Sequence, residues 1–268
     1  MPHVLRIPPP PDDWVAADCL GRFPFDGTRV LAQWEALHVG QPLPPPASPA
    51  LAGAWALYHA GDFAAAVQAG QRFGGRDGAA LADQASAIYA NYVEPDDERR
   101  LALLRQVGER ALARHEANPD DVPALYWHAY ALGRHAQAVS VARALAQGLG
   151  GRLKDTLERI IALQPDHADA HFALGAFHAE VIDKVGELVA RMTYGVRPER
   201  AIELFEQGLA LHPASATGRV EYARALVALR GEPALAQVHQ LYEDAAAIEP
   251  IDARQFLDRE VALACMAD

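Results

Sequence analysis

The chain has 268 residues, a formal net charge of −11 at pH 7, and only two lysines, Lys154 and Lys184. Nucleic acids are bound through clustered positive charge, so this composition argues against nucleic acid and favours cationic, aromatic or apolar partner segments. No apolar run approaches the roughly 18 residues that a membrane-spanning helix requires, and the first residues lack the apolar core of a signal peptide. We therefore expect a cytoplasmic protein with no membrane span.

Composition also bounds the fold class and the redox compartment. Ala, Leu and Arg dominate, and no run alternates with the period of a strand, which predicts an almost wholly helical, all-α chain. Cys19 and Cys265 lie near opposite ends and form neither a disulfide framework nor a metal pair. We expect both to be ordinary thiols in a reducing compartment. The excess of Arg over Lys is typical of a GC-rich bacterial genome.

Residues 1–46 form a proline-rich segment that differs from the rest of the chain. The proline-rich runs PPPP at 8–11 and PLPPP at 42–46 are stiff, extended spacers on either side of four large aromatic residues. One short helix is predicted from Thr28 to about His38, ended by Gly40 and Pro42. The four aromatic residues are Trp14, Phe23, Phe25 and Trp34.

These aromatic side chains need cover, because leaving them in water would forgo several kcal/mol and the segment is too short for a core of its own. We expect the segment to fold back on the first helices of the array, around Leu51, Trp55 and Tyr58. It would act there either as an extra capping helix or as a resident occupant of a groove that a partner displaces.

Residues 47–251 are predicted to form an array of about five helical pairs. Gly61-Asp62-Phe63 marks the turn of the opening pair, and Pro95-Asp96-Asp97 starts a later helix. Further prolines then divide the sequence at intervals of 46, 48 and 37 residues, so two adjacent units are enlarged relative to a repeat of about 34 residues. These prolines are Pro119, Pro165, Pro213 and Pro250.

The clearest unit runs from Ile160 to Pro213. Its front helix is predicted to begin after Pro165, with Asp166 as the N-cap and Asp169 completing an approximate capping box. The apolar face of that helix continues through Met192 at helical spacing. Gly195 and Pro198 then separate it from a back helix that ends at Pro213.

The two enlarged units are expected to lie side by side, because both carry long apolar stripes. In the first unit, the front helix is predicted to bend or break between Gly133 and Ser140. In the second, the stripe is expected to face residues 139–149. If the side chains of this second stripe are exposed instead, we interpret the stripe as the interface of a homodimer. The stripe consists of Val181, Val185, Leu188 and Met192.

Six positions in the clearest unit form a recognisable pattern: Leu174, Gly175, Ala201, Phe205, Gly208 and Pro213. They resemble the Leu-Gly, Ala, aromatic, small and Pro positions of a tetratricopeptide repeat, except that Gly208 stands where the family usually has Ala. An enlarged repeat of this kind resembles the regulator-of-microtubule-dynamics type of tetratricopeptide protein and its bacterial relatives, over roughly Leu125 to Pro250. The resemblance implies an α-α superhelix, an interaction role and no catalytic motif.

Residues 252–268 follow the last repeat and are predicted to form an amphipathic capping helix. A capping element covers the apolar side that the final repeat would otherwise expose. The residues expected to face inward are Phe256, Leu257, Val261 and Leu263.

Candidate chemistry is sparse. His167 and His171 have the spacing at which two imidazoles can share a metal ion, with His178 and Glu180 further along, but the Glu of a metalloprotease motif is replaced by Ala168. Glycines at 148–151 precede a helix start without the phosphate-loop or dinucleotide pattern. No nucleophile motif is present. We expect no catalytic residues, no metal and no cofactor.

The remaining candidate is a concave groove lined by the front helices, as the resemblance implies. Chaperone-tail clamps of this family grip a carboxylate with Lys, Asn and Arg, and of these only Arg224 is present. The predicted function is a non-catalytic scaffold that holds an extended or helical, apolar, aromatic or cationic partner segment. The alternatives are a small-molecule or lipid carrier, resembling the tetratricopeptide component of tripartite transporters, and a histidine-metal enzyme. The predicted groove residues are Leu51, Trp55, Tyr58, His128, Leu132, His135, Phe172, Ala176, Ala179, Glu180, Val220 and Arg224.

Overall fold

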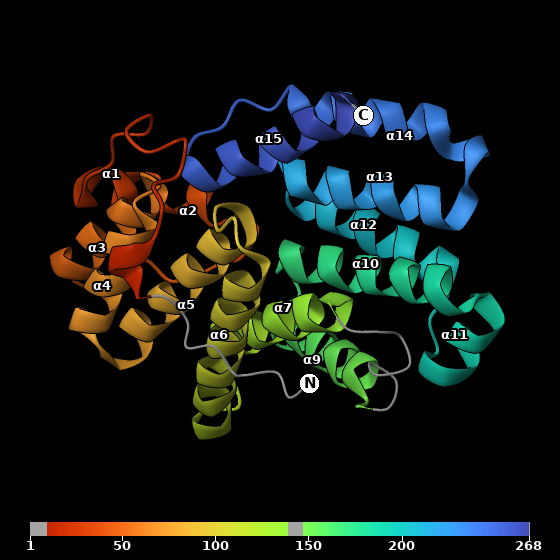
Figure 1. Ribbon diagram of the computed structural model, residues 1–268, viewed down its shortest axis with the longest axis horizontal. Helices are drawn as coiled ribbons and strands as arrows, with labels where there is room; N and C mark the ends of the chain where they lie inside the picture. The colour runs from red at the N-terminus through yellow and green to blue at the C-terminus, as the bar shows by residue number, and fades with distance from the viewer. Residues whose placement is uncertain (1–9, 139–146, 268) are drawn as a thin grey trace. The chain divides into compact units, whose positions relative to one another are not determined.

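The computed structural model describes residues 10–138 and 147–267, and every regular element within these ranges is a helix (Figure 1). The predicted all-α class is confirmed. The chain divides into two compact units. Unit 1 comprises Met1–Leu37, Pro44–Ser140 and Asp252–Arg254, and unit 2 comprises His38–Leu43, Val141–Ile251 and Gln255–Asp268.

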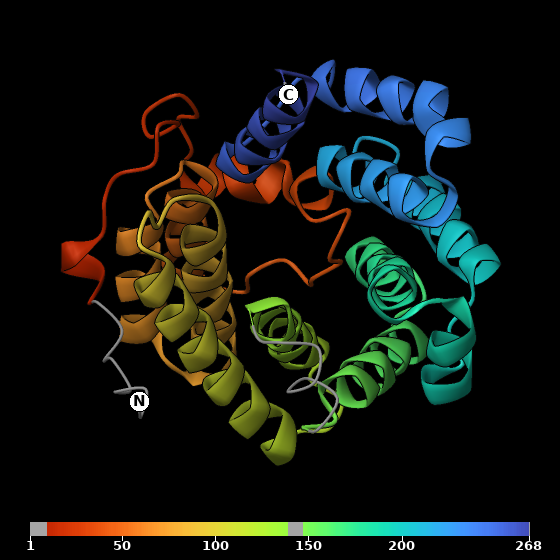
Figure 2. The same ribbon diagram turned by 45° about the vertical axis from the view of Figure 1, so that its right-hand side comes forward.

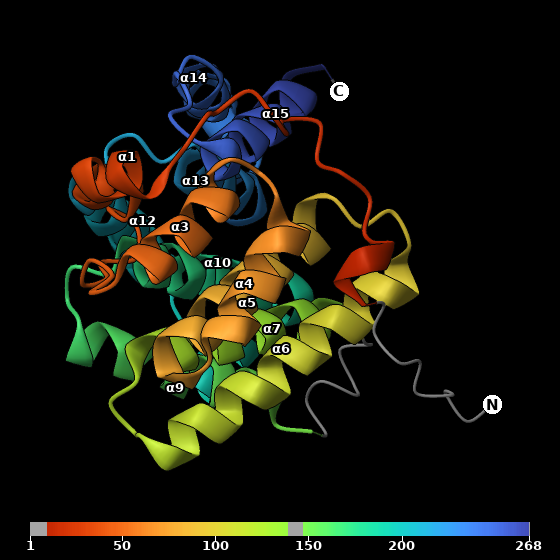
Figure 3. The ribbon, with the colours of Figure 1, turned by 90° about the vertical axis from the view of Figure 1, so that its left-hand side faces the viewer.

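Unit 1 is a succession of helices in which each long helix packs on the next. Contacts also join α3 to α5 and α5 to α7, so that each of these helices touches its next-but-one neighbour. Figure 3 shows these helices from the side. The elements are η1 (Pro11–Asp13), α1 (Gly27–Ala32), α2 (Trp34–Leu37), α3 (Pro49–His59), α4 (Phe63–Phe73), α5 (Gly75–Tyr92), α6 (Asp97–Ala117) and α7 (Val122–Ala138).

Side-chain caps start the long helices of unit 1 where the sequence offers an acceptor. Ser48 Oγ accepts from the N–H of Leu51 at the start of α3, and Asp62 Oδ1 accepts from that of Ala65 at the start of α4. Asp96 caps α6 in the same way. These bonds satisfy amide hydrogens that have no partner inside the helix.

The amino-terminal aromatic residues pack on unit 1, as expected, but at more than one place. Trp34 meets Trp55 edge-on, with ring centroids 5.4 Å apart. Phe25 lies 5.6 Å from the ring of His59 on α3. Trp14 instead stacks on Tyr89 of α5. The single helix predicted from Thr28 to His38 corresponds to α1 and α2, which are separated by Gln33.

Unit 2 repeats the pattern of sequential packing. Helix α10 contacts α9, α12 and α13, and α13 contacts α14. Figure 2 shows α12, α13 and α14 as successive ribbons toward the blue end of the colour scale. The elements are α9 (Leu149–Leu163), α10 (Ala168–Val185), α11 (Glu187–Tyr194), α12 (Pro198–Leu211), α13 (Ala216–Arg230), η2 (Glu232–Ala234), α14 (Leu235–Ala246) and α15 (Ala253–Ala267), whose first two residues are counted with unit 1.

The prediction of one long front helix from Pro165 through Met192 is wrong in two respects. The N-cap is His167, whose Nδ1 accepts from the N–H of Ala170, whereas Asp166 is exposed. The helix also ends at Val185, because Gly186 adopts a φ of 81° and a separate helix, α11, follows. Only glycine reaches this backbone region without strain.

The predicted break between Gly133 and Ser140 lies partly outside the described residues. Helix α7 is continuous to Ala138, and the segment expected to face the apolar stripe begins at residue 139. At the other end of the chain, α15 is helical as predicted and buries Phe256 and Leu257. Leu263, however, is exposed and does not face inward.

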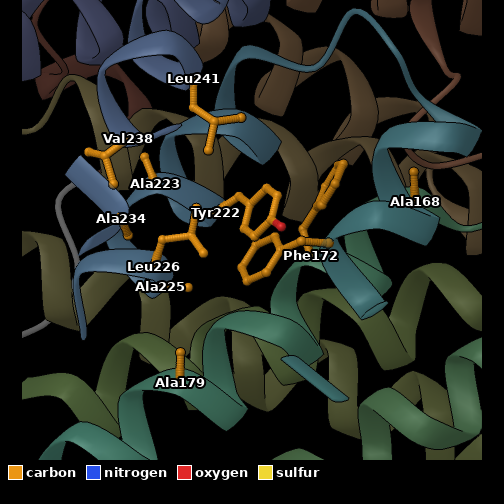
Figure 4. Close-up of a cluster of buried hydrophobic side chains, with 11 residues drawn as sticks. Ala168, Phe172, Ala179, Tyr222, Ala223, Ala225, Leu226, Ala234, Val238 and Leu241 are labelled. Atoms are coloured by element: carbon orange, nitrogen blue, oxygen red, sulfur yellow. The ribbon is translucent and has the colours of Figure 1, made fainter. Parts of the chain in front are cut away.

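The core of unit 2 is built around a stack of aromatic rings. Phe172 on α10 lies 6.3 Å from Phe205 on α12, which in turn stacks on Tyr222 of α13 at 5.0 Å. Aliphatic side chains of α13 and α14 complete the cluster, including Leu226 and Val238 (Figure 4). Helix propensity alone would not hold these elements; the shared apolar core does.

Residues 38–43 pack against the α9–α10 turn within unit 2. The N–H of Asp169 donates to the carbonyl of Gly40, and Gln41 Nε2 donates to Asp169 Oδ2 at 2.7 Å. Gln164 Nε2 donates to the carbonyl of Pro42. Asp169, predicted as part of a capping box, therefore anchors this distant segment.

Candidate functional site

The predicted groove residues of α3 are core residues. Leu51, Trp55 and Tyr58 are all buried, and the ring of Trp55 is sandwiched edge-on between Trp34 and Tyr58. The amino-terminal segment thus covers this helix. These three side chains have little surface to offer a partner while the segment stays in place.

The predicted groove residues of α7 are more accessible. His128 is half-buried and bonds through Nδ1 to the carbonyl of Gly108, Leu132 is half-buried, and His135 is exposed. Beside them, the guanidinium of Arg134 lies 5.2 Å from the ring centroid of Tyr130. This i, i+4 pair of cation and aromatic ring was not among the predicted site residues, although its spacing is visible in the sequence.

In unit 2, the predicted groove residues divide between core and surface. Phe172, Ala179 and Val220 are buried, and Ala176 is half-buried. Glu180 pairs with Lys184 one turn away. Arg224 is exposed, pairs with Glu221 at 2.9 Å, and approaches Cys265 Sγ at 3.6 Å.

Histidines at the candidate metal positions have structural roles. His167 caps α10, and His171 Nε2 lies 3.0 Å from the carbonyl oxygen of Pro165. Burial lowers the pKa of His178, whose Nδ1 accepts from the N–H of Arg197 at 3.3 Å. Among the described residues, no three His, Cys, Asp or Glu side chains are grouped so that they could hold a metal ion.

A buried polar cluster in unit 1 contains Cys19, His59 and Asp252. His59 Nδ1 lies 2.7 Å from Asp252 Oδ2, and Cys19 Sγ lies 3.9 Å from the carbonyl oxygen of Ala253. Burial, with Asp252 as a smaller contributor, raises the pKa of Cys19 to about 11. A thiol that stays protonated is a poor nucleophile, so the cluster fits attachment of the chain at residues 252–254 better than catalysis.

A second buried network joins α5, α6 and the start of α7. Asp83 on α5 accepts from Arg110 and Arg114 of α6 at 2.7 and 2.6 Å. Arg114 also approaches Asp121, which caps α7 through the N–H of Ala124. Burial raises the pKa of Asp83, while the two guanidinium groups act in the opposite direction. The network connects three helices and presents no reactive group to solvent.

Helix α11 carries an exposed apolar stripe. Leu188 is 72% exposed and Met192 is 79% exposed, whereas Ala190 on the opposite side is fully buried. Val189 adds further apolar surface at 50% exposure. Contiguous apolar surface of this kind on a folded protein marks an interaction site more often than chance exposure does.

The contacts between helices indicate the class of protein. Helices that touch both their next and their next-but-one neighbours are characteristic of all-α proteins built from stacked helical units. No helix among the described residues is both long and apolar enough to cross a membrane.

The family follows from comparison with known proteins. The family described as regulator of microtubule dynamics protein 1-3 matches residues 67–262, and the chain belongs to this family. The resemblance to the regulator-of-microtubule-dynamics type is thus confirmed, over a longer stretch than the one predicted, whereas the tetratricopeptide type of the repeats stays a prediction. A comparison with curated proteins finds no match.

Proposed function

We propose that the protein is a non-catalytic tetratricopeptide-type scaffold that holds an extended or helical segment of a partner protein. The observation that carries the proposal is the accessible side of α7, where Tyr130 and Leu132 are half-buried and His135 is exposed. Aromatic and aliphatic side chains beside a cationic Arg134 offer packing surface with few demands on partner sequence. The polar clusters Cys19–His59–Asp252 and Asp83–Arg110–Arg114 are engaged inside the fold, which supports a binding role over a catalytic one.

The tetratricopeptide-type arrangement is supported by the contacts of α10. It packs on α12 and on α13, as a front helix would pack on its own back helix and on the next front helix. Helix α11 then represents the insertion that enlarges the repeat. Helix α15 caps the array, an assignment supported by the burial of Phe256, Leu257 and Ala262. We place the protein in the cytoplasm, in keeping with two free cysteines.

The proposal is tested with peptides selected for binding to the whole chain. Leu132→Glu places a charge on the proposed binding side of α7, and Leu112→Glu makes the same change on the exposed side of α6 as a control. We expect Leu132→Glu to weaken binding by about tenfold or more, which is about 1.4 kcal/mol, and Leu112→Glu to leave it unchanged. Equal affinities for both variants would contradict the proposal.

Native mass spectrometry of the purified chain separates the scaffold from the alternatives. A clean mass that matches the sequence supports the scaffold. A copurified lipid or small molecule would replace the scaffold with the carrier, and a bound metal would reopen the histidine-metal hypothesis.

A further inference from the structure

The segment around η1 is held on unit 1 by a small number of specific contacts. Trp14 stacks flat on Tyr89, with ring centroids 3.9 Å apart and planes inclined by 7°. The N–H of Val15 donates to Tyr89 Oη at 3.2 Å, and Arg99 Nη2 donates to the carbonyl of Asp13 at 3.2 Å. Figure 3 shows η1 in red beside the yellow start of α6.

The receiving surface, which we call the Tyr89 site, is held in place by its own bonds. Tyr89 Oη donates to Glu94 Oε2 at 3.1 Å, and Glu94 also pairs with Arg99 and accepts from the N–H of Asp96. Gln68 of α4 completes the site by donating to Asp12 Oδ1. Burial raises the pKa of Tyr89 to about 12, so its hydroxyl stays protonated and can both donate and accept. A site fixed in this way loses little entropy when a segment binds.

The bound segment has the features of a recognised peptide. Pro10 has φ −64° and ψ 155°, the polyproline conformation, and follows Pro8 and Pro9 in the sequence. A chain that is already extended loses little conformational freedom on binding. Two of its contacts use main-chain atoms, one uses the flat face of Trp14, and one uses the carboxylate of Asp12.

The segment is also weakly held compared with the chain that follows it. No residue of η1 is buried, and Val15 and Ala16 are exposed. The first buried positions are Ala17 and Cys19. Residues 10–16 can therefore leave the Tyr89 site without opening the core of unit 1.

We infer that the Tyr89 site is a peptide-docking site, occupied in the isolated chain by its own residues 10–15, for a partner segment with prolines followed by acidic residues and a tryptophan. Gln68 selects an acidic residue through the carboxylate of Asp12, Arg99 holds the main chain at Asp13, and Tyr89 selects the aromatic ring. The site is separate from the side of α7 that carries the proposed function. A partner with the matching segment competes with the resident one, so the resident segment lowers the apparent affinity.

The test uses the full-length chain and a labelled peptide of residues 8–18, PPPPDDWVAAD, in fluorescence anisotropy. Trp14→Ala weakens the resident segment and leaves the Tyr89 site intact. We expect the peptide to bind this variant about tenfold more tightly than the unmodified chain. Adding Tyr89→Ala to Trp14→Ala removes the stacking surface and should abolish binding. A peptide with alanine in place of its tryptophan should not bind.

Each alternative result has a defined meaning. If the peptide binds Trp14→Ala no more tightly than the unmodified chain, or if Tyr89→Ala has no effect, the segment is a fixed part of the fold and the inference fails. Should Trp14→Ala not fold, Asp12→Ala removes only the contact with Gln68 and serves in its place. Leu132→Glu should leave this binding unchanged, so failure here is distinct from failure of the proposed function.

Discussion

The ring of Phe172 lies so close to the backbone of Gly208 that a methyl group at position 208 would overlap it. The same ring also fills the space beside Gly218 on α13. Phe172 thus inserts between α12 and α13 at the points where both helices lack side chains. The glycine at 208, where tetratricopeptide repeats usually have alanine, has a direct steric explanation.

Gly208→Ala is expected to destabilise the protein by about 1–3 kcal/mol, because Phe172 is locked among buried neighbours and cannot move aside. Gly53→Ala is the matched control: it lies inside α3 with no atom within 4 Å of the added methyl group. The control should be neutral or stabilise the protein by up to about 1 kcal/mol. Urea denaturation of both variants measures the difference, and similar midpoints would contradict the explanation.

Gly175→Leu tests the close packing of α10 against α12. A Cβ at position 175 would lie 3.0 Å from the Phe205 ring and 3.1 Å from the carbonyl oxygen of Ala201. Because a leucine cannot fit in this space, we expect a loss of about 1–3 kcal/mol in the free energy of unfolding. An unchanged denaturation midpoint would show that α10 and α12 can separate at no cost.

Arg114→Met tests the buried network of α5 and α6. The variant leaves Asp83, which is only 1% exposed, with Arg110 as its remaining charged partner, and we expect a loss of about 2 kcal/mol. Arg105→Met on the same helix removes an exposed pair with Glu109 and should cost less than about 0.5 kcal/mol. Equal losses in thermal or chemical denaturation would mean that burial of Asp83 has no special role.

The two cysteines are expected to differ in reactivity. In the native chain at pH 8, iodoacetamide should modify Cys265 and leave Cys19, because Cys19 is fully buried and burial raises its pKa to about 11. Peptide mapping by mass spectrometry measures the two sites. Modification of both at the same rate would place Cys19 at the surface.

The same pKa shift predicts a loss of stability in alkali. The folded thiol at Cys19 holds its proton to about pH 11, whereas the unfolded thiol ionises near 9.0. The contribution of the buried, protonated thiol to the free energy of unfolding is therefore complete below pH 9 and is lost as pH rises through 11. Cys19→Ala should remove this part of the pH dependence, so its curve should be flatter than that of the unmodified chain over this range.

Most of the correct predictions rest on residues that start or stop a helix locally. Most of the features that were not predicted depend on contacts between residues far apart in the sequence. Pro198 opens α12, as its predicted role between the front and back helices requires. The end of α10 depends on Gly186 at positive φ, which the periodic apolar pattern across it conceals. The bond between Gln41 and Asp169 joins residues 128 positions apart, so no local signal could reveal it. The predicted return of the amino-terminal segment to α3 brings Trp34 onto Trp55, and it leaves Leu51, Trp55 and Tyr58 buried.

Self-association through α11 is the remaining prediction, and it follows from the exposure of Leu188 and Met192. Burying these side chains against a second copy would remove apolar area from water, at roughly 25 cal/mol per Å². We expect the molar mass measured by light scattering to rise with concentration toward that of a dimer. Leu188→Ser with Met192→Ser should keep the chain monomeric without lowering its melting temperature, because neither side chain supports the core. The matched control, Leu263→Ser with Met266→Ser, changes two exposed residues of α15 and should still dimerise. A chain that stays monomeric at its highest soluble concentration would overturn the prediction.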